Sequence, residues 1–179
     1  MRIDSSGNVG IGTSSPATAL SVVGDITTTG GVFLGGTGAA NKLDDYEEGT
    51  WTGTVADAAS SGNESSSVVY GTYTKVGKII YVQFNVSNID TTGLTAGNDV
   101  YITGLPFATA SVTGNAKYTG TAHLSLVTFS GTPFLNADES ATVLRIGESN
   151  SGAGNDFVVV SQLSSAASDI HGNLVYQTT

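Results

Sequence analysis

The sequence predicts an all-β protein in which a short, repetitive N-terminal β-shaft precedes an antiparallel β-sandwich of jelly-roll type. Small residues are abundant, with 24 Gly, yet apolar residues still make up 39% of the chain. That mixture is typical of strands joined by tight turns rather than of disorder. Helical periodicity is almost absent, whereas residues 49–179 contain runs in which apolar and polar residues alternate. A period of two is the pattern of half-buried strands.

Residues 1–45 contain only short apolar runs, which Gly or polar pairs separate. These runs are Ile3, Val9 with Ile11, Leu20 with Val22, Ile26, and residues 32–34. Each run is too short to bury itself. We therefore expect this segment to gain a core by packing against other chains, as repetitive β-architectures do.

Residues 46–179 are expected to form a second domain, large enough to fold alone. The runs 68–76 and 78–86, joined through Gly77, predict a β-hairpin. Further strands are expected at 50–55, 99–103, 117–129, 141–146, 157–163 and 173–177, and turns at 60–67, 91–98, 136–140, 148–155 and 164–169. Roughly eight short strands separated by such turns indicate an antiparallel sandwich or jelly roll.

The stretch GNVGIGTS, residues 7–14, has the glycine pattern of a phosphate-binding loop but lacks its other parts. A Walker loop needs Lys and then Ser or Thr after the last glycine, and Gly12 is followed by TSSP. A dinucleotide fingerprint needs G-x-G-x-x-G at the start of a helix, and the order here is G-x-x-G-x-G. We expect Gly7 with Asn8 to form a turn, and Gly10 and Gly12 to lie where backbones approach too closely for a Cβ.

Bulk composition excludes several partners. The net charge of −9 argues against nucleic acid, whose phosphates require a basic patch. No apolar run of about 18 residues is present, so we expect no membrane insertion. The start of the chain lacks an apolar signal core, so export by a secretory signal is not expected. Cys is absent, which removes disulfides and thiolate metal sites.

Two long motifs resemble the fibre proteins of tailed bacteriophages, especially those of marine and cyanobacterial phages. RIDSSGNVGIGTSSPATALSVVGDI, residues 2–26, is similar to a recurrent shaft element, and LDDYEEGTWTGTV, residues 43–55, is similar to the segment that opens a β-rich terminal domain. That domain usually continues with a Y-T-K-I-G hairpin and a G-L-P-F turn, whose counterparts lie at 73–77 and 104–107. Beyond residue 107 the chain matches only in general character.

The resemblance implies a parallel homotrimer, with residues 1–45 as an interwoven shaft and residues 46–179 as the head. The glycines of the shaft would let three chains come close, and residues 1–10 would dock on other virion proteins. Gly53 stands where the family usually has Pro. The long anchoring region of large fibres is missing before Arg2, and there is no room for a self-cleaving chaperone domain, so a short fibre is expected.

The resulting hypothesis is a virion structural protein, assembled in the host cytoplasm and extracellular after lysis. It is a short trimeric tail fibre or receptor-binding adhesin. The alternatives are a head fibre or capsid decoration protein and, third, a glycan-degrading tailspike enzyme. No catalytic, cofactor-binding or metal-binding residue is assigned, and no cofactor is expected.

Some chemistry stays open as alternatives. The acidic cluster Asp44-Asp45-Tyr46-Glu47-Glu48 is expected to be a solvated junction, paired with Lys42 of a neighbouring chain, and the alternative is a Ca²⁺ site. Trp51 is expected to be a core anchor rather than a sugar-stacking platform. His123 is expected on a strand and His171 in a turn, unless a three-fold axis gathers three copies of one histidine around a metal.

The carboxylates that an enzyme could use for glycoside hydrolysis are Asp138, Glu139, Glu148 and Asp156, all in turn-rich segments. The strand tyrosines that could stack on glycans are Tyr70, Tyr73, Tyr81, Tyr101 and Tyr118. Packing or trimer contact is the expected role of these rings. A site for a host surface glycan or receptor is expected instead in the loops 91–98 and 148–155, because binding residues concentrate on loops.

Overall fold

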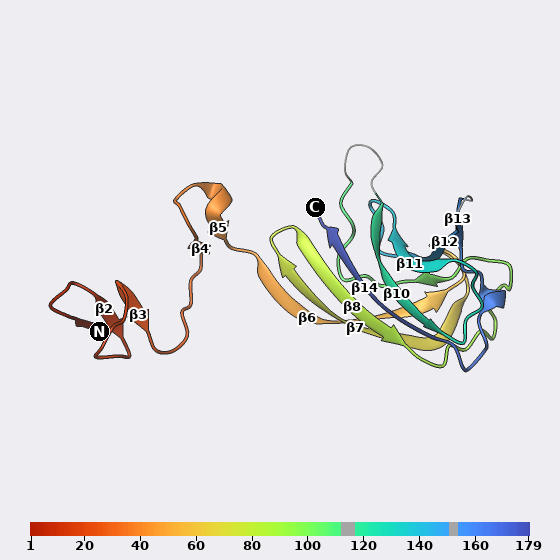
Figure 1. The fold of residues 1–179 in the computed structure, drawn as a ribbon, viewed down its shortest axis with the longest axis horizontal. Helices are drawn as coiled ribbons and strands as arrows, with labels where there is room; N and C mark the ends of the chain where they lie inside the picture. The colour runs from red at the N-terminus through yellow and green to blue at the C-terminus, as the bar shows by residue number, and fades with distance from the viewer. Residues whose placement is uncertain (112–116, 151–153) are drawn as a thin grey trace. The chain divides into compact units, whose positions relative to one another are not determined.

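The structure is a computed structural model that describes residues 1–111, 117–150 and 154–179. The chain divides into two compact units, Met1–Asp44 and Asp45–Thr179; the boundary expected from the sequence lies between residues 45 and 46. In the described residues the only helices are two short 3₁₀ turns, η1 (Ala39–Asn41) and η2 (Val160–Gln162). The prediction of an all-β protein is therefore confirmed (Figure 1).

The N-terminal unit consists of very short strands. They are β1 (Arg2–Ile3), β2 (Val9–Ile11), β3 (Leu20–Val22), β4 (Val32–Phe33) and β5 (Lys42–Leu43). β2 pairs antiparallel with β1 and parallel with β3, and β4 pairs antiparallel with β5. No residue of this unit, all of which the structure describes, belongs to the buried hydrophobic cluster.

The glycines of the N-terminal unit have local roles. Gly7 has φ +83° and its N–H donates to the Asp4 carbonyl at 3.1 Å, which confirms the predicted turn. A Cβ on Gly10 would lie 2.5 Å from the carbonyl oxygen of Thr13, and one on Gly12 would lie 2.6 Å from that of Val23. The expected close approaches thus occur within one chain, and these glycines do not by themselves require a second chain.

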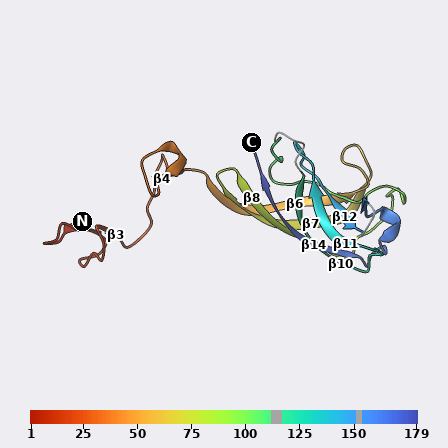
Figure 2. The same cartoon turned by 45° about the horizontal axis from the view of Figure 1, so that its top comes forward.

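The second unit is one large antiparallel sheet. Its strands are β6 (Tyr46–Ala56), β7 (Glu64–Val76), β8 (Ile79–Val86), β9 (Tyr101–Ile102), β10 (Tyr118–Ser125), β11 (Thr132–Ala137), β12 (Leu144–Ser149), β13 (Asn155–Phe157) and β14 (Asp169–Gln177). Their order is β11-β10-β14-β8-β7-β6-β9-β12-β13. β11 also pairs with β12, which closes a ring of eight strands (Figure 1, Figure 2). Closure of this kind leaves few exposed sheet edges.

The core lies inside this ring. Along β8, residues alternate strictly between exposed and buried, so Ile80, Val82 and Phe84 point inward, and the alternation expected for a half-buried strand is confirmed here. Trp51 on β6 is only 7% exposed and meets Phe84 edge to face, with ring centroids 6.0 Å apart. The expectation that Trp51 is a core anchor is confirmed. Such an aromatic pair adds about 1 kcal/mol beyond the area it buries.

The predicted hairpin is confirmed as β7 and β8, which turn at Gly77 with φ +57°. Other predictions were wrong. β11 was not predicted, because Pro133 lowers the strand propensity of residues 132–137. The predicted strand 157–163 ends at Phe157 and gives way to η2. Predicted turns at 60–67 and 136–140 overlap β7, which begins at Glu64, and β11, which ends at Ala137.

Candidate functional site

A concave groove of about 830 Å³ lies on the outer face of five neighbouring strands, β6, β7, β8, β14 and β10. Two cross-strand rows of side chains line it. The first row is Thr50, Thr72, Gln83, Asn173 and Thr121, and the second row is Thr52, Tyr70, Asn85, His171 and His123. Each row takes one residue from each strand. We call the two rows and the space between them the polar groove.

The outward direction of both rows follows from strand geometry. Between the two rows lies an inward-facing row, which is Trp51, Gly71, Phe84, Gly172 and Ala122. Since successive side chains point to opposite faces, burial of Trp51 and Phe84 forces their neighbours outward. Eight of the ten residues of the polar groove are exposed, and His171 and Asn173 are half-buried.

The inward-facing row also explains two glycines. A Cβ on Gly71 would lie 2.3 Å from Nε1 of Trp51, and a Cβ on Gly172 would lie 2.7 Å from Cδ1 of Leu135. Glycine at these positions lets large side chains pack directly against the backbone of the sheet. The floor of the polar groove is therefore the sheet itself, held from beneath by the core.

The polar groove contains no Lys, Arg, Asp or Glu, although the chain as a whole has a net charge of −9. The groove presents hydroxyls, amides, two imidazoles and one phenol. Nδ2 of Asn173 donates to Oγ1 of Thr121 at 2.8 Å, which fixes the amide at one end of the first row. These groups both donate and accept hydrogen bonds.

The two histidines of the chain meet in the second row. His123 lies on β10, as predicted, but His171 lies on β14 and not in a turn. They are direct cross-strand partners with ring centroids 5.9 Å apart. In the part of the chain that the structure describes, no group of three or more His, Cys, Asp or Glu could hold a metal ion.

The acidic cluster is divided among separate partners. Asp44 pairs with Lys42 of the same chain, with 2.9 Å between Oδ2 and Nζ. The Lys42 side chain lowers the pKa of Asp44 by donating a hydrogen bond to it. On β6, Tyr46 donates from its hydroxyl to Glu48 at 3.1 Å. Asp44 and Glu48 thus have different partners, and these contacts do not support the Ca²⁺ alternative.

The remaining carboxylates of this cluster connect the motifs that carry the phage-fibre resemblance. Asp45 pairs with Lys75, and Glu47 accepts a hydrogen bond from the Tyr73 hydroxyl. The ring of Tyr73 meets Phe107 edge to face at 5.4 Å. Residues from LDDYEEGTW, YTKVG and GLPF thus pack together although they are far apart in sequence. Their role here is structural.

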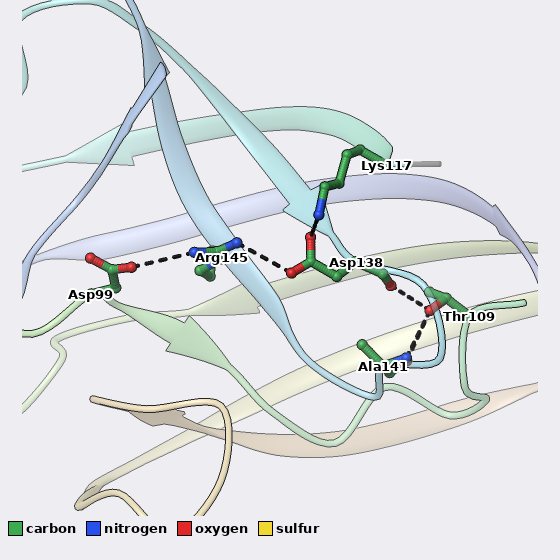
Figure 3. Close-up of polar contacts among 6 residues, drawn as sticks. All are labelled: Asp99, Thr109, Lys117, Asp138, Ala141 and Arg145. Carbon is green, nitrogen blue, oxygen red and sulfur yellow. Dashed lines mark hydrogen bonds and ion pairs between the residues drawn. The ribbon is translucent and has the colours of Figure 1, made fainter. Parts of the chain in front are cut away.

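Asp138, a candidate for glycoside hydrolysis, belongs to an ion-pair chain (Figure 3). Its carboxylate pairs with Lys117 and, at 3.3 Å, with Arg145, whose other end pairs with Asp99 at 3.5 Å. The guanidinium of Arg145 also lies over the ring of Phe157, 3.8 Å from its centroid. These ion pairs link Arg145 on β12 to Asp99 and Asp138, and both carboxylate oxygens of Asp138 are paired.

The other candidate carboxylates accept hydrogen bonds or lie exposed on the surface. Glu148 is buried, and its Oε2 accepts from the backbone N–H of Ser130 at 2.7 Å and of Gly131 at 3.0 Å. These bonds lower the pKa of Glu148, opposite to what a general acid needs. Glu139 accepts from the Ser111 hydroxyl at 2.8 Å. Asp156 is exposed on β13, opposite Glu148.

The tyrosines differ in exposure. Tyr73, Tyr101 and Tyr118 are half-buried, whereas Tyr70 is 61% and Tyr81 41% exposed. Only Tyr70 lies in the polar groove. Of the two candidate loops, 91–98 is tied down where Asp57 accepts from the backbone N–H of Thr95 at 2.8 Å. Residues 151–153 of the loop 148–155 lie outside the described residues.

Sequence reasoning did not find the polar groove as a site. Its residues come from five strands, and the only signals for it were three single residues, Tyr70, His123 and His171. Among the described residues no helix is long and apolar enough to span a membrane. Comparisons of the chain with protein-family models, with curated proteins and with solved structures give no match.

Proposed function

We propose that this chain is a bacteriophage virion protein, a short homotrimeric fibre that attaches the particle to its host. Residues 1–45 form the interwoven shaft and dock on other virion proteins. Residues 46–179 form a jelly-roll-like head that presents the receptor-binding surface. The resemblance of residues 2–26 and 43–55 to phage fibre motifs supports this proposal.

The observation that carries the proposal is the exposure of apolar side chains in the N-terminal unit. Ten large apolar residues are exposed there: Met1, Ile3, Ile11, Leu20, Val23, Ile26, Val32, Phe33, Leu34 and Leu43. Exposed apolar surface on this scale marks an interaction site. In a trimeric shaft, three copies would cover one another's apolar residues.

A second apolar patch, on the outer face of the head, supports contact between copies. Its members are Tyr46, Val76, Ile79, Tyr81 and Val175, each exposed by 41–59%. Tyr46 on β6, Val76 on β7 and Ile79 on β8 form one cross-strand row. Tyr81, two residues further along β8, is the cross-strand partner of Val175 on β14. We call this set the apolar patch.

The test is the mass of the purified protein in solution. Light scattering is expected to give three times the chain mass of 18.1 kDa. The double variant Val23→Ser, Phe33→Ser is expected to lower that mass, while Ser6→Ala and Thr27→Ser together serve as a control at polar positions. A monomeric wild-type protein would overturn the proposal.

The alternative of a head fibre or capsid decoration protein makes the same prediction for mass. Antibody labelling of phage particles in electron micrographs distinguishes the two. Label at the tail supports the adhesin, and label on the head supports the decoration protein. Label on neither would contradict both.

A further inference from the structure

We propose that the polar groove binds a neutral oligosaccharide chain. This inference rests on the proposed adhesive function for its biological meaning, and it deepens that function by naming the surface and the ligand class. It moves the receptor site from the loops to the face of the sheet. The evidence is the chemistry, shape and rigidity of the two rows.

The residue types in the two rows exclude several classes of ligand. Neither row contains Lys or Arg, so phosphates, sulfates and nucleic acid would lack a counter-charge. Neither row contains Asp or Glu, so a cationic ligand would lack one too. Apolar lining is confined to the floor, where Trp51, Phe84 and Ala122 lie between the rows, and neither row contains an aliphatic side chain. A lipid chain or an apolar peptide would therefore meet polar groups along both sides. A neutral ligand rich in hydroxyls remains.

Hydroxyl-rich ligands match the groups that are present. Each sugar hydroxyl donates one hydrogen bond and accepts others, and the side chains of Thr, Asn, Gln and neutral His do both. Gln83 and Asn85 are exposed on β8, the middle strand of the five. Their amides are therefore placed to reach a ligand that lies along either row.

Tyr70 supplies the apolar component that sugar recognition also requires. It is the only aromatic side chain of the two rows other than the imidazoles, and its ring is 61% exposed although it stands among polar groups. An aromatic ring in a wet polar site offers a flat face to the C–H groups of a sugar while its hydroxyl stays solvated. This combination distinguishes the groove from an ordinary solvated sheet face.

The dimensions of the groove suit a chain rather than a single sugar. Its volume of about 830 Å³ lies at the upper end of typical ligand sites. Five strands spaced about 4.8 Å apart make each row about 19 Å long. Both rows stand on paired strands with Trp51 and Phe84 packed beneath, so little ordering entropy would be lost on binding.

Contact between copies of the chain is the competing use of this face. The apolar patch is where such contact is expected, because the cores of homo-oligomeric interfaces are enriched in apolar residues. The polar groove begins beyond that patch on the same strands, and its two rows consist of polar side chains with the single phenol ring of Tyr70. Three copies held together by the shaft would present three grooves, and binding would gain from avidity.

The experiment is a glycan array that carries neutral and acidic oligosaccharides, probed with the fluorescently labelled full-length protein. Titration calorimetry follows with the neutral oligosaccharide that gives the strongest signal. Tyr70→Ala is expected to weaken the affinity at least about tenfold, and Gln83→Ala with Asn85→Ala to weaken it similarly. Tyr70→Phe is expected to keep most of the affinity, because the ring face remains.

The matched control is Tyr81→Ala, which removes an exposed tyrosine from the same face but outside the groove. It is expected to leave the calorimetric affinity per site unchanged. Circular dichroism checks that each variant is folded, and light scattering checks that each keeps the wild-type mass, because Tyr81 belongs to the apolar patch. Binding only to acidic glycans, binding to none, or equal affinity of wild type and Tyr70→Ala would overturn the inference. A trimer without glycan binding would overturn only the inference, whereas a monomer that binds neutral glycans would overturn only the proposed fibre.

Discussion

The two compact units of this chain use the same kinds of apolar residue in opposite ways. In the first unit Leu20 is 56% exposed on a strand of three residues, whereas in the second Leu144 is fully buried on a strand of six. Strands in the first unit pair in twos and threes, and those in the second close into a ring. The number and length of paired strands decide whether an apolar residue has a core to enter.

The comparison separates stability from assembly. The second unit has its own hydrophobic cluster and can fold on what it buries. The first unit contributes nothing to that cluster and exposes ten large apolar side chains, which contacts with other molecules would cover. We therefore expect substitutions in the second unit to change the free energy of unfolding, and those in the first to change association.

The largest expected effect comes from one substitution made in both units. Leu144→Ala should lower the free energy of unfolding of the head by about 2–5 kcal/mol, because it opens a cavity in the core. Leu20→Ala should leave the unfolding of the second unit unchanged and weaken the proposed trimer. Urea denaturation followed by Trp51 fluorescence, at fixed protein concentration, measures the first effect, and light scattering measures the second. An equal loss of unfolding free energy in both variants would contradict the assignment of stability to the second unit and of association to the first.

The next effect tests the packing beneath the polar groove. Gly71→Ala would place a Cβ 2.3 Å from Nε1 of Trp51 and 2.7 Å from the Gln83 carbonyl oxygen. Overpacking of this kind should cost about 1–3 kcal/mol of unfolding free energy. Gly97→Ala is the control, since no atom lies within 4 Å of its added Cβ. Similar urea midpoints for the two variants would refute the packing described for Trp51.

The sequence predicted those parts of the fold that depend on neighbouring residues. Alternation along 78–86 was enough to place Ile80, Val82 and Phe84 on one face of a strand, and Gly77 was enough to place the hairpin. β11 escaped prediction because Pro133 lowers its strand propensity, and its pairing with β10 and β12 outweighs that. His171 was placed in a turn because Gly172 and Asn173 follow it, but β14 is held on both sides by β8 and β10.

The candidate site depends on strand order, which the sequence did not predict. The two rows join residues that are as much as 123 positions apart, such as Thr50 and Asn173. No local pattern marks them, because each strand contributes only an ordinary polar residue on its solvent face. Their common lack of charge becomes visible only after β14 is inserted between β8 and β10.

A smaller effect on stability is expected from Glu148, and it should depend on pH. Backbone hydrogen bonds hold the pKa of Glu148 in the folded protein below its ordinary value of 4.5. The ionised group therefore stabilises the folded state above that value, and this contribution is lost as pH falls through the lower, folded pKa. Glu148→Gln should lower Tm by about 5 °C at pH 7. The difference between variant and wild type should shrink towards pH 3, and a constant difference would contradict the mechanism.

The smallest effect should come from ion pairs on the surface, which both units have. Lys42 pairs with Asp44 in the first unit, and Lys117 pairs with Asp138 in the second. In each pair both side chains are about a third or more exposed, so solvent and salt screen the attraction. Lys117→Ala should shift the urea midpoint of the second unit by less than about 0.3 M. Lys42→Ala should leave the mass in solution, for which the proposed trimer is expected, unchanged. A large effect of either variant would mean that charge, rather than apolar burial, makes the two units differ.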